Sequence, residues 1–222
     1  EDALTATSQA RPLWRRSAVV GPVLGVVLLG AMAASTSFVA AGSAVVAAGT
    51  AAEFAELNYT DVIVPSLTDR AVPVAELVTA ILADPDAAGE EFGRREGEGK
   101  PYSYPVSATG TIAEGSFGEV GLEVDGMPEG ITVGVAIPPL GSSTALRDAG
   151  AELTFGDFVN QTEYQKVAIE LNTRAAAEVY ADLDLTTMVG SEITVVGGTT
   201  WVSKTGGEVT HVTIVPVSIE VG

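Results

Sequence analysis

The sequence has no cysteine and a single histidine, His211, among its 222 residues. Without cysteine, this stretch of chain can hold no disulfide, thiolate metal site, cysteine nucleophile or acylated cysteine. With one histidine, a histidine-based metal cluster or catalytic triad is not expected. Phosphate-binding loops, nucleophile motifs and metal-ligand spacings are also missing. We therefore predict no metal, no cofactor and no catalytic residue.

Basic residues are scarce as well. Eleven Lys and Arg stand against 29 Asp and Glu, which gives a net charge of −18. Only eight of those basic residues, but 27 of the acidic ones, lie from Glu53 onward. So acidic a domain repels phosphate backbones, which argues against nucleic acid as a partner, and it disfavours contact with anionic lipid. The simplest consequence of the charge is solubility.

One long stretch, Ser17–Ala52, lacks charge altogether and follows Arg15 and Arg16. Within it, residues 18–41 are long enough to cross a bilayer as a helix. Basic residues before such a segment favour a cytoplasmic N-terminus. We expect a cytoplasmic segment at 1–17, a transmembrane or signal-anchor helix at 18–41, a tether at 42–52 and an extracytoplasmic domain at 53–222. The alternatives are a signal peptide cleaved near Ala33 or Ala41, which would leave the domain secreted, and a buried soluble helix.

Residues 53–103 are predicted to be a helical and loop part. Apolar residues recur at helical spacing over 74–82, with Pro73 before them and Pro85 after them. A weaker helical piece lies near 54–64. Residues 84–89 partly match a calcium loop, but Ala88 and Arg95 stand where oxygen ligands are needed. We interpret that segment as the end of one helix and the start of another, followed by a glycine-rich loop at 93–103.

Residues 104–222 are predicted to form five strands and one helix. Apolar residues alternate over 104–112, 120–124 and 131–137, and again over 192–203 and 209–221, where Pro216 suggests an edge strand or a bulge. A long connection at 140–156 leads to an amphipathic helix at about 158–182, capped by Asp157. Three strands, a helix and two strands make the connectivity of the OB-fold. The predicted class is α+β, a mainly antiparallel OB-like barrel with the 53–103 part packed on it or covering one end. Another antiparallel sheet packed with helices is the alternative.

Two regions compete as the candidate site. OB barrels bind ligands on the middle strands and at two loops, here 115–118 and 204–207, which offer only Phe117 and Lys204 and no platform for stacked bases. The long connections are richer in arginine forks and amides, which suit hydroxylated or anionic small ligands. The alternative is that these groups satisfy buried backbone atoms. The predicted ligand-binding residues are Arg94, Arg95, Arg147, Asp148, Asn160, Gln161 and Tyr164.

Several short strings together resemble one bacterial family. They are Asp84-Pro85-Asp86-Ala87-Ala88-Gly89, Phe92-Gly93-Arg94-Arg95-Glu96-Gly97, Pro101-Tyr102-Ser103, Gly141 with Thr144-Ala145-Leu146-Arg147-Asp148, Phe155 with Asp157-Phe158, Asn160-Gln161, Glu163-Tyr164, Leu171-Asn172, and Pro216-Val217-Ser218. Over about 53–222 the chain is similar to the domain of unknown function 2291 family, predicted periplasmic lipoproteins. The resemblance implies an extracytoplasmic, membrane-attached protein associated with ribose-type sugar ABC transport systems. The chain departs from the lipoprotein pattern because it has no cysteine to acylate, so a protein anchor would replace the lipid.

Three functional hypotheses follow. The first is a membrane-anchored extracytoplasmic accessory or binding protein, whose partner is a small ligand or a component of an ABC transporter. The second is a structural or assembly factor for an envelope or transporter complex. The third is a hydrolase that uses paired carboxylates, such as Asp148 with Asp157 or Glu163, in different environments. In so acidic a domain carboxylate pairs also arise by chance, so we favour a protein that is not an enzyme.

Overall fold

The computed structural model describes residues 49–222 except 154, 204 and 205. The predicted cytoplasmic segment, the helix at 18–41 and residues 42–48 of the tether lie outside the described residues. Over the part that is described, no helix is both long enough and apolar enough to cross a bilayer.

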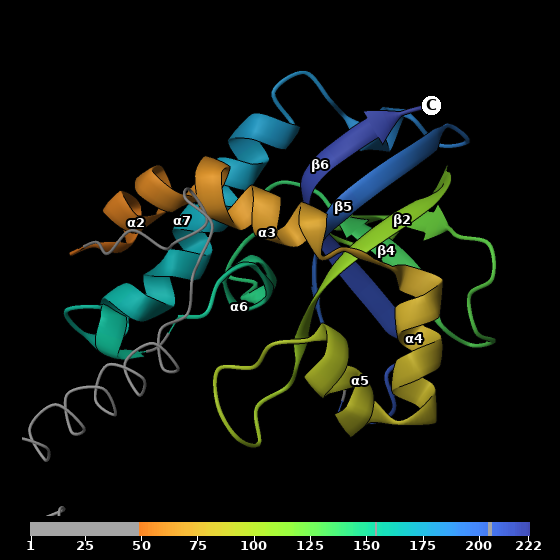
Figure 1. Ribbon diagram of the computed structural model, residues 1–222. Coiled ribbons are helices and arrows are strands. Elements are labelled where there is room, and N and C mark those ends of the chain that lie inside the picture. The colour runs from red at the N-terminus through yellow and green to blue at the C-terminus, as the bar shows by residue number, and fades with distance from the viewer. Residues whose placement is uncertain (1–48, 154, 204–205) are drawn as a thin grey trace, which may run out of the picture. The chain divides into compact units, whose positions relative to one another are not determined.

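The described chain is built around a closed barrel of five strands (Figure 1). They are β2 (Ser103–Ala113), β3 (Glu119–Glu123), β4 (Thr132–Ala136), β5 (Glu192–Thr200) and β6 (His211–Val221). Their order is β2-β3-β4-β6-β5, and β2 closes the barrel by pairing with β5. A two-residue strand, β1 (Val72–Pro73), adds to β2. The predicted OB-like barrel is confirmed, and the sheet is mixed because β4 and β6 run parallel.

The barrel interior follows from the alternation of side chains along each strand. Inward residues of all five strands share one apolar cluster, including Val106, Val120, Val135, Ile193 and Ile214. Helix α4 (Val74–Ala83) adds Val74, Leu77, Val78 and Ile81 to this cluster, while Leu82 of the predicted apolar set is exposed. Asp84 then caps α5 (Pro85–Phe92), since its Oδ1 accepts the Ala87 N–H at 3.0 Å. The helix stop and restart predicted around Pro85 is confirmed.

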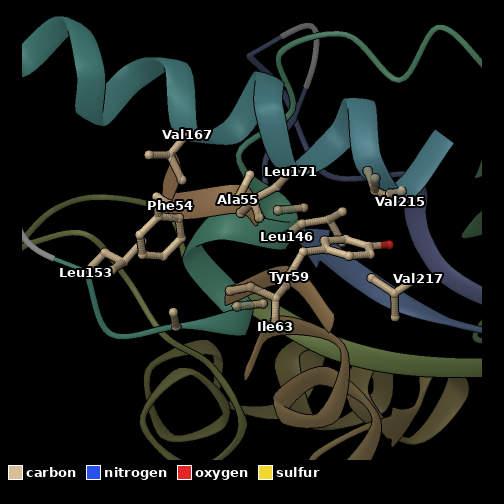
Figure 2. Packing of buried hydrophobic residues seen from close by; sticks show 14 of the residues in the cluster. Phe54, Ala55, Tyr59, Ile63, Leu146, Leu153, Val167, Leu171, Val215 and Val217 are labelled. Carbon is tan, nitrogen blue, oxygen red and sulfur yellow. The ribbon is translucent and has the colours of Figure 1, made fainter. Parts of the chain in front are cut away.

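A second apolar cluster joins the outer side of the barrel to the remaining helices. Helix α2 (Ala51–Asn58), the π-helical turn η2 (Tyr59–Ile63) and α3 (Val64–Asp69) cover the weaker helical piece expected near 54–64. Tyr59 is fully buried, between Leu171 of the long helix α7 (Gln161–Val179) and Val215 and Val217 of β6 (Figure 2). Packing against α7 and the barrel therefore stabilises these N-terminal helices, whose own sequence shows only weak helical periodicity.

The connection between β4 and β5 differs in detail from the prediction. A short helix, α6 (Ala145–Gly150), and a 3-10 turn, η3 (Phe155–Asp157), occupy the part expected to be irregular. Helix α7 runs over Gln161–Val179, shorter than the predicted 158–182, and a 3-10 turn, η4 (Leu185–Thr187), follows it. The predicted cap at Asp157 was wrong: Asn160 is the N-cap, because its Oδ1 accepts the Glu163 N–H at 3.0 Å. Phe158 lies before α7, buried against the ring of Phe54.

Pro216 marks a bulge in β6. The register with β5 shifts there, because Val196 pairs with Ser218 whereas Gly197 pairs with Pro216. The edge-strand alternative is wrong, since β6 lies between β4 and β5. Gly197 allows β5 to lie close to β6 at the bulge, because a Cβ at this position would lie 2.1 Å from the Val215 carbonyl oxygen.

Candidate functional site

The outer face of β3, β4 and β6 carries a group of polar side chains. Because Val120, Val133 and Val212 point into the barrel, their neighbours along each strand point outward. The parallel register sets Thr132 of β4 beside His211 of β6. Strand pairing therefore gathers a carboxylate, an imidazole and two hydroxyls on one surface: Glu119, His211, Thr132 and Thr213.

Glu119 is the centre of this group and is only 7% exposed. Its Oε1 accepts the Ser116 hydroxyl at 2.7 Å, and its Oε2 accepts the Thr213 hydroxyl at 2.9 Å. His211 Nε2 lies 2.8 Å from Oε1. This contact is an ion pair when the imidazole is protonated. On the other side of the ring, Nδ1 is 2.7 Å from Thr132 Oγ1.

The electrostatics of Glu119 favour its charged form. Burial alone would raise the pKa of this carboxyl, but Ser116, His211 and Thr213 stabilise the carboxylate, and the net effect is a lowered pKa. Glu119 is therefore ionised at neutral pH. Its negative charge is fixed in place by three neighbours from the β2–β3 turn and β6.

Gly134 leaves space for the side chains of Glu119 and His211. A Cβ at this position of β4 would lie 2.9 Å from Glu119 Cδ and 3.1 Å from His211 Cε1. Because real Cβ atoms rarely approach so closely, any larger residue would push both side chains away. The small residue at 134 is thus part of the site.

A cleft of about 730 Å³ opens beside this group. Its apolar floor and walls come from the β3–β4 connection and the segments flanking the β5–β6 turn: Val124, Met127, Ile131, Val202 and Val209. Exposed carboxylates of Glu114, Glu123 and Glu208 also line it. A smaller cavity of about 270 Å³ shares Glu119, His211 and Val202 with the cleft and includes Phe117, whose side chain is fully exposed. The combined volume and mixed lining are typical of small-molecule sites.

Three of the predicted site residues, Arg147, Asp148 and Tyr164, lie together where α6 meets α7. Arg147 is 3% exposed, its Nε donates to Asp148 Oδ1 at 2.6 Å, and its guanidinium carbon lies 4.2 Å from the centre of the Tyr164 ring. It also donates to the Tyr164 carbonyl and lies 3.8 Å from a Glu96 carboxylate oxygen. Burial raises the pKa of the Tyr164 hydroxyl to about 12. These contacts link α6, α7 and the 93–103 loop.

The other four predicted residues are dispersed. Arg94 pairs with Ser103 through the backbone, and its Nε is 3.8 Å from Glu152. Arg95 lies over the Tyr102 ring at 4.7 Å. Asn160 caps α7, and Gln161 is its exposed first residue. A ligand role for the seven residues stays a prediction.

The carboxylates of the hydrolase hypothesis have structural partners. Asp148 pairs with Arg147. Glu163 accepts the Ala51 N–H at 3.0 Å and pairs with Lys166, and these two contacts lower the pKa of its carboxyl. Glu163 thus joins the start of α7 to the start of α2. Across the described residues, no group of three His, Asp or Glu side chains is placed to hold a metal ion.

Sequence reasoning missed Glu119 and His211. A lone histidine carries no motif, and Glu119 is one of 27 acidic residues from Glu53 onward. One available signal was the alternation itself, which sets Glu119 and His211 on the outer faces of two strands that adjoin β4 in an OB topology. Gly115 and Ser116 of the first predicted loop line the cleft, as do Ser203 and Glu208, which flank the second.

The topology identifies the class of fold. A closed five-stranded barrel with β4 parallel to β6 and a helix between β4 and β5 is an OB-fold. The chain is similar to a crystal structure, at 1.90 Å resolution, of an OB-fold protein from Thermotoga maritima MSB8, with a TM-score of 0.60 and 16% identity over 79% of this chain and 99% of that chain.

The family is shown by a direct match. The model of the family described as "Predicted periplasmic lipoprotein (DUF2291)" matches residues 24–220, and the chain belongs to this family. The sequence-based resemblance is thereby confirmed. A search of curated proteins finds no match. Membership indicates an extracytoplasmic protein that is either attached to the membrane or secreted.

Proposed function

We propose that the chain is an extracytoplasmic binding protein attached to the membrane through residues 18–41, and that its ligand occupies the cleft on β3 and β4. The observation that carries this proposal is that the polar group around Glu119 and His211 borders the 730 Å³ cleft. The cleft lies on the strands and loops that OB-folds use for binding. A glycine at 134 that leaves space for Glu119 and His211 supports a built site.

Attachment through residues 18–41 rests on their uncharged, mainly apolar character behind Arg15 and Arg16. The absence of cysteine makes a clean test possible. Glu56→Cys places one thiol on an exposed position of α2. A membrane-impermeant maleimide should label this variant in intact cells, and the labelled protein should stay in the membrane fraction after alkaline washing. Labelling only after lysis would contradict the proposed location.

The binding role is tested by filling the cleft. Thr210 is exposed and lines the cleft, whereas Thr162 is exposed on α7 away from it. We expect compounds that raise the thermal midpoint of the full-length wild type to act equally on Thr162→Trp and to lose their effect on Thr210→Trp. Equal stabilisation of both variants, or none across a panel of neutral, cationic and anionic compounds, would contradict binding in the cleft.

A second candidate is an accessory or assembly role, with a sugar ABC transporter or another envelope complex as the partner. It is supported by the family resemblance and uses the same location. Affinity purification from detergent-solubilised membranes separates the two roles. A permease that co-purifies equally with wild type and Thr210→Trp favours assembly through another surface, while a ligand effect confined to the cleft favours binding.

A further inference from the structure

We propose that the ligand of the β3–β4 cleft is an organic cation, a molecule that joins an ammonium or guanidinium group to an apolar body. This inference rests on the proposed binding function and adds the chemical class of the ligand. It follows from the distribution of charge around the cleft, from the apolar floor and from the exposed ring at its edge.

Charge is segregated along the chain. Residues 101–146, which include β2, β3 and β4, contain five carboxylates and neither lysine nor arginine. Most basic residues of the domain lie instead on the N-terminal helices, the 93–103 loop, α6 and α7: Arg70, Arg94, Arg95, Lys100, Arg147, Lys166 and Arg174. The eighth, Lys204, lies outside the described residues. The charged side chains among the described residues that line the cleft are mainly carboxylates, which concentrate cations and repel anions.

The carboxylates of the cleft divide into two kinds. Glu119 is engaged by Ser116, Thr213 and His211, and its role is to hold the imidazole and the β2–β3 turn. Glu123 and Glu208 are exposed and line the cleft, and among the described residues around it no lysine or arginine competes for them. These are the groups that a ligand cation would meet. An anionic head group would meet like charge at Glu123 and Glu208, which is costly.

The remaining lining accounts for the apolar body. Val124, Met127 and Ile131 form an apolar surface next to the carboxylates, and a thioether adapts its shape to different ligands. Phe117 stands fully exposed at the edge of the smaller cavity, which adjoins the cleft through Glu119 and His211. An aromatic face attracts an ammonium or guanidinium group directly.

Three probes with one apolar body and different head groups test the inference: 2-phenylethylamine, 2-phenylethanol and 3-phenylpropionate. We expect the amine to bind the full-length protein with a Kd about tenfold lower than the alcohol, a factor equal to about 1.4 kcal/mol, and the carboxylate not to bind. Between about 0.1 M and about 1 M NaCl the amine should lose most of this advantage, because the screening length falls from about 10 Å to about 3 Å. Ligand-observed NMR titration measures all three.

Paired variants place the effect. In the double variant Glu123→Gln/Glu208→Gln, the amine should bind only as tightly as the alcohol. The control double variant Glu56→Gln/Glu90→Gln changes exposed residues of α2 and α5, and it should leave the Kd of both compounds unchanged. Alcohol binding as tight as amine binding, with both lost in Thr210→Trp, would overturn the cationic class and leave the cleft as the binding site. Amine binding that survives Thr210→Trp, or no binding by any probe, would overturn the inference together with the site.

Discussion

His211 Nε2 lies 2.8 Å from Glu119 Oε1, and both residues line the cleft on the barrel face and the smaller cavity beside it. Neither residue belongs to a sequence motif. The contact exists because β3 and β6 both flank β4, whose glycine at 134 leaves the space that the two side chains fill.

Replacing Glu119 by glutamine should lower the free energy of unfolding by about 1–3 kcal/mol at pH 7, because hydrogen bonds to a buried charge are lost. The lowered pKa of Glu119 sets the pH dependence. Its stabilisation is present above the ordinary glutamate pKa of about 4.3 and is lost as the pH falls through the lower, folded-state value. Urea denaturation at several pH values should show wild type and variant converging in acid. Glu123→Gln, exposed on the same strand, is the control, and a pH-independent difference would contradict the prediction.

Arg147→Ala should lower the free energy of unfolding by about 3–5 kcal/mol, because it leaves Asp148 without its buried partner and removes the link between α6 and α7. Arg95→Ala removes an exposed guanidinium and should cost less than about 1 kcal/mol. Thermal denaturation compares them. A thermal midpoint nearly unchanged in Arg147→Ala would instead favour the predicted ligand role of this residue.

Asn160→Ala should cost about 1 kcal/mol, since the side chain caps α7 at the Glu163 N–H. Asn160→Asp keeps the acceptor and should retain most of the stability. Gln161→Ala, next along the helix and exposed, should stay within about 0.5 kcal/mol of wild type. Chemical denaturation with circular dichroism detects these differences, and equal losses for the alanine and aspartate variants would show that the cap does not stabilise α7.

Gly134→Ala should destabilise the protein by about 1–3 kcal/mol, because the added methyl group collides with Glu119 and His211. In a Glu119→Ala background the same change should cost clearly less, since the obstructing carboxylate is gone. Gly97→Ala, where a Cβ meets open space, is the control. If Gly134→Ala lowers the free energy of unfolding equally in both backgrounds, the added methyl group does not collide with the Glu119 side chain.

Local signals accounted for most of the secondary structure. The alternation over 104–137 and 192–221 predicted the strands, and Pro85 with Asp84 marked the break between α4 and α5, because both signals depend on residues close in the chain. Helix α6 was missed because its six residues are too few to display a period, and almost all are buried. The cap of α7 was misplaced by three residues because Asp157 and Asn160 are both good caps, and packing of Phe158 on Phe54 decides between them.

The sequence by itself determined the order of elements, the OB connectivity, the family and the acidic character of the domain, since each depends on residue type and spacing. Only the tertiary structure decided where the polar residues meet. Pairing of β4 with β6 is a contact between distant segments. Together with the pairing of β3 with β4, it brings Glu119 to His211 beside an apolar cleft. The same long-range packing buries Arg147, a residue predicted to bind a ligand, inside the junction of α6 and α7.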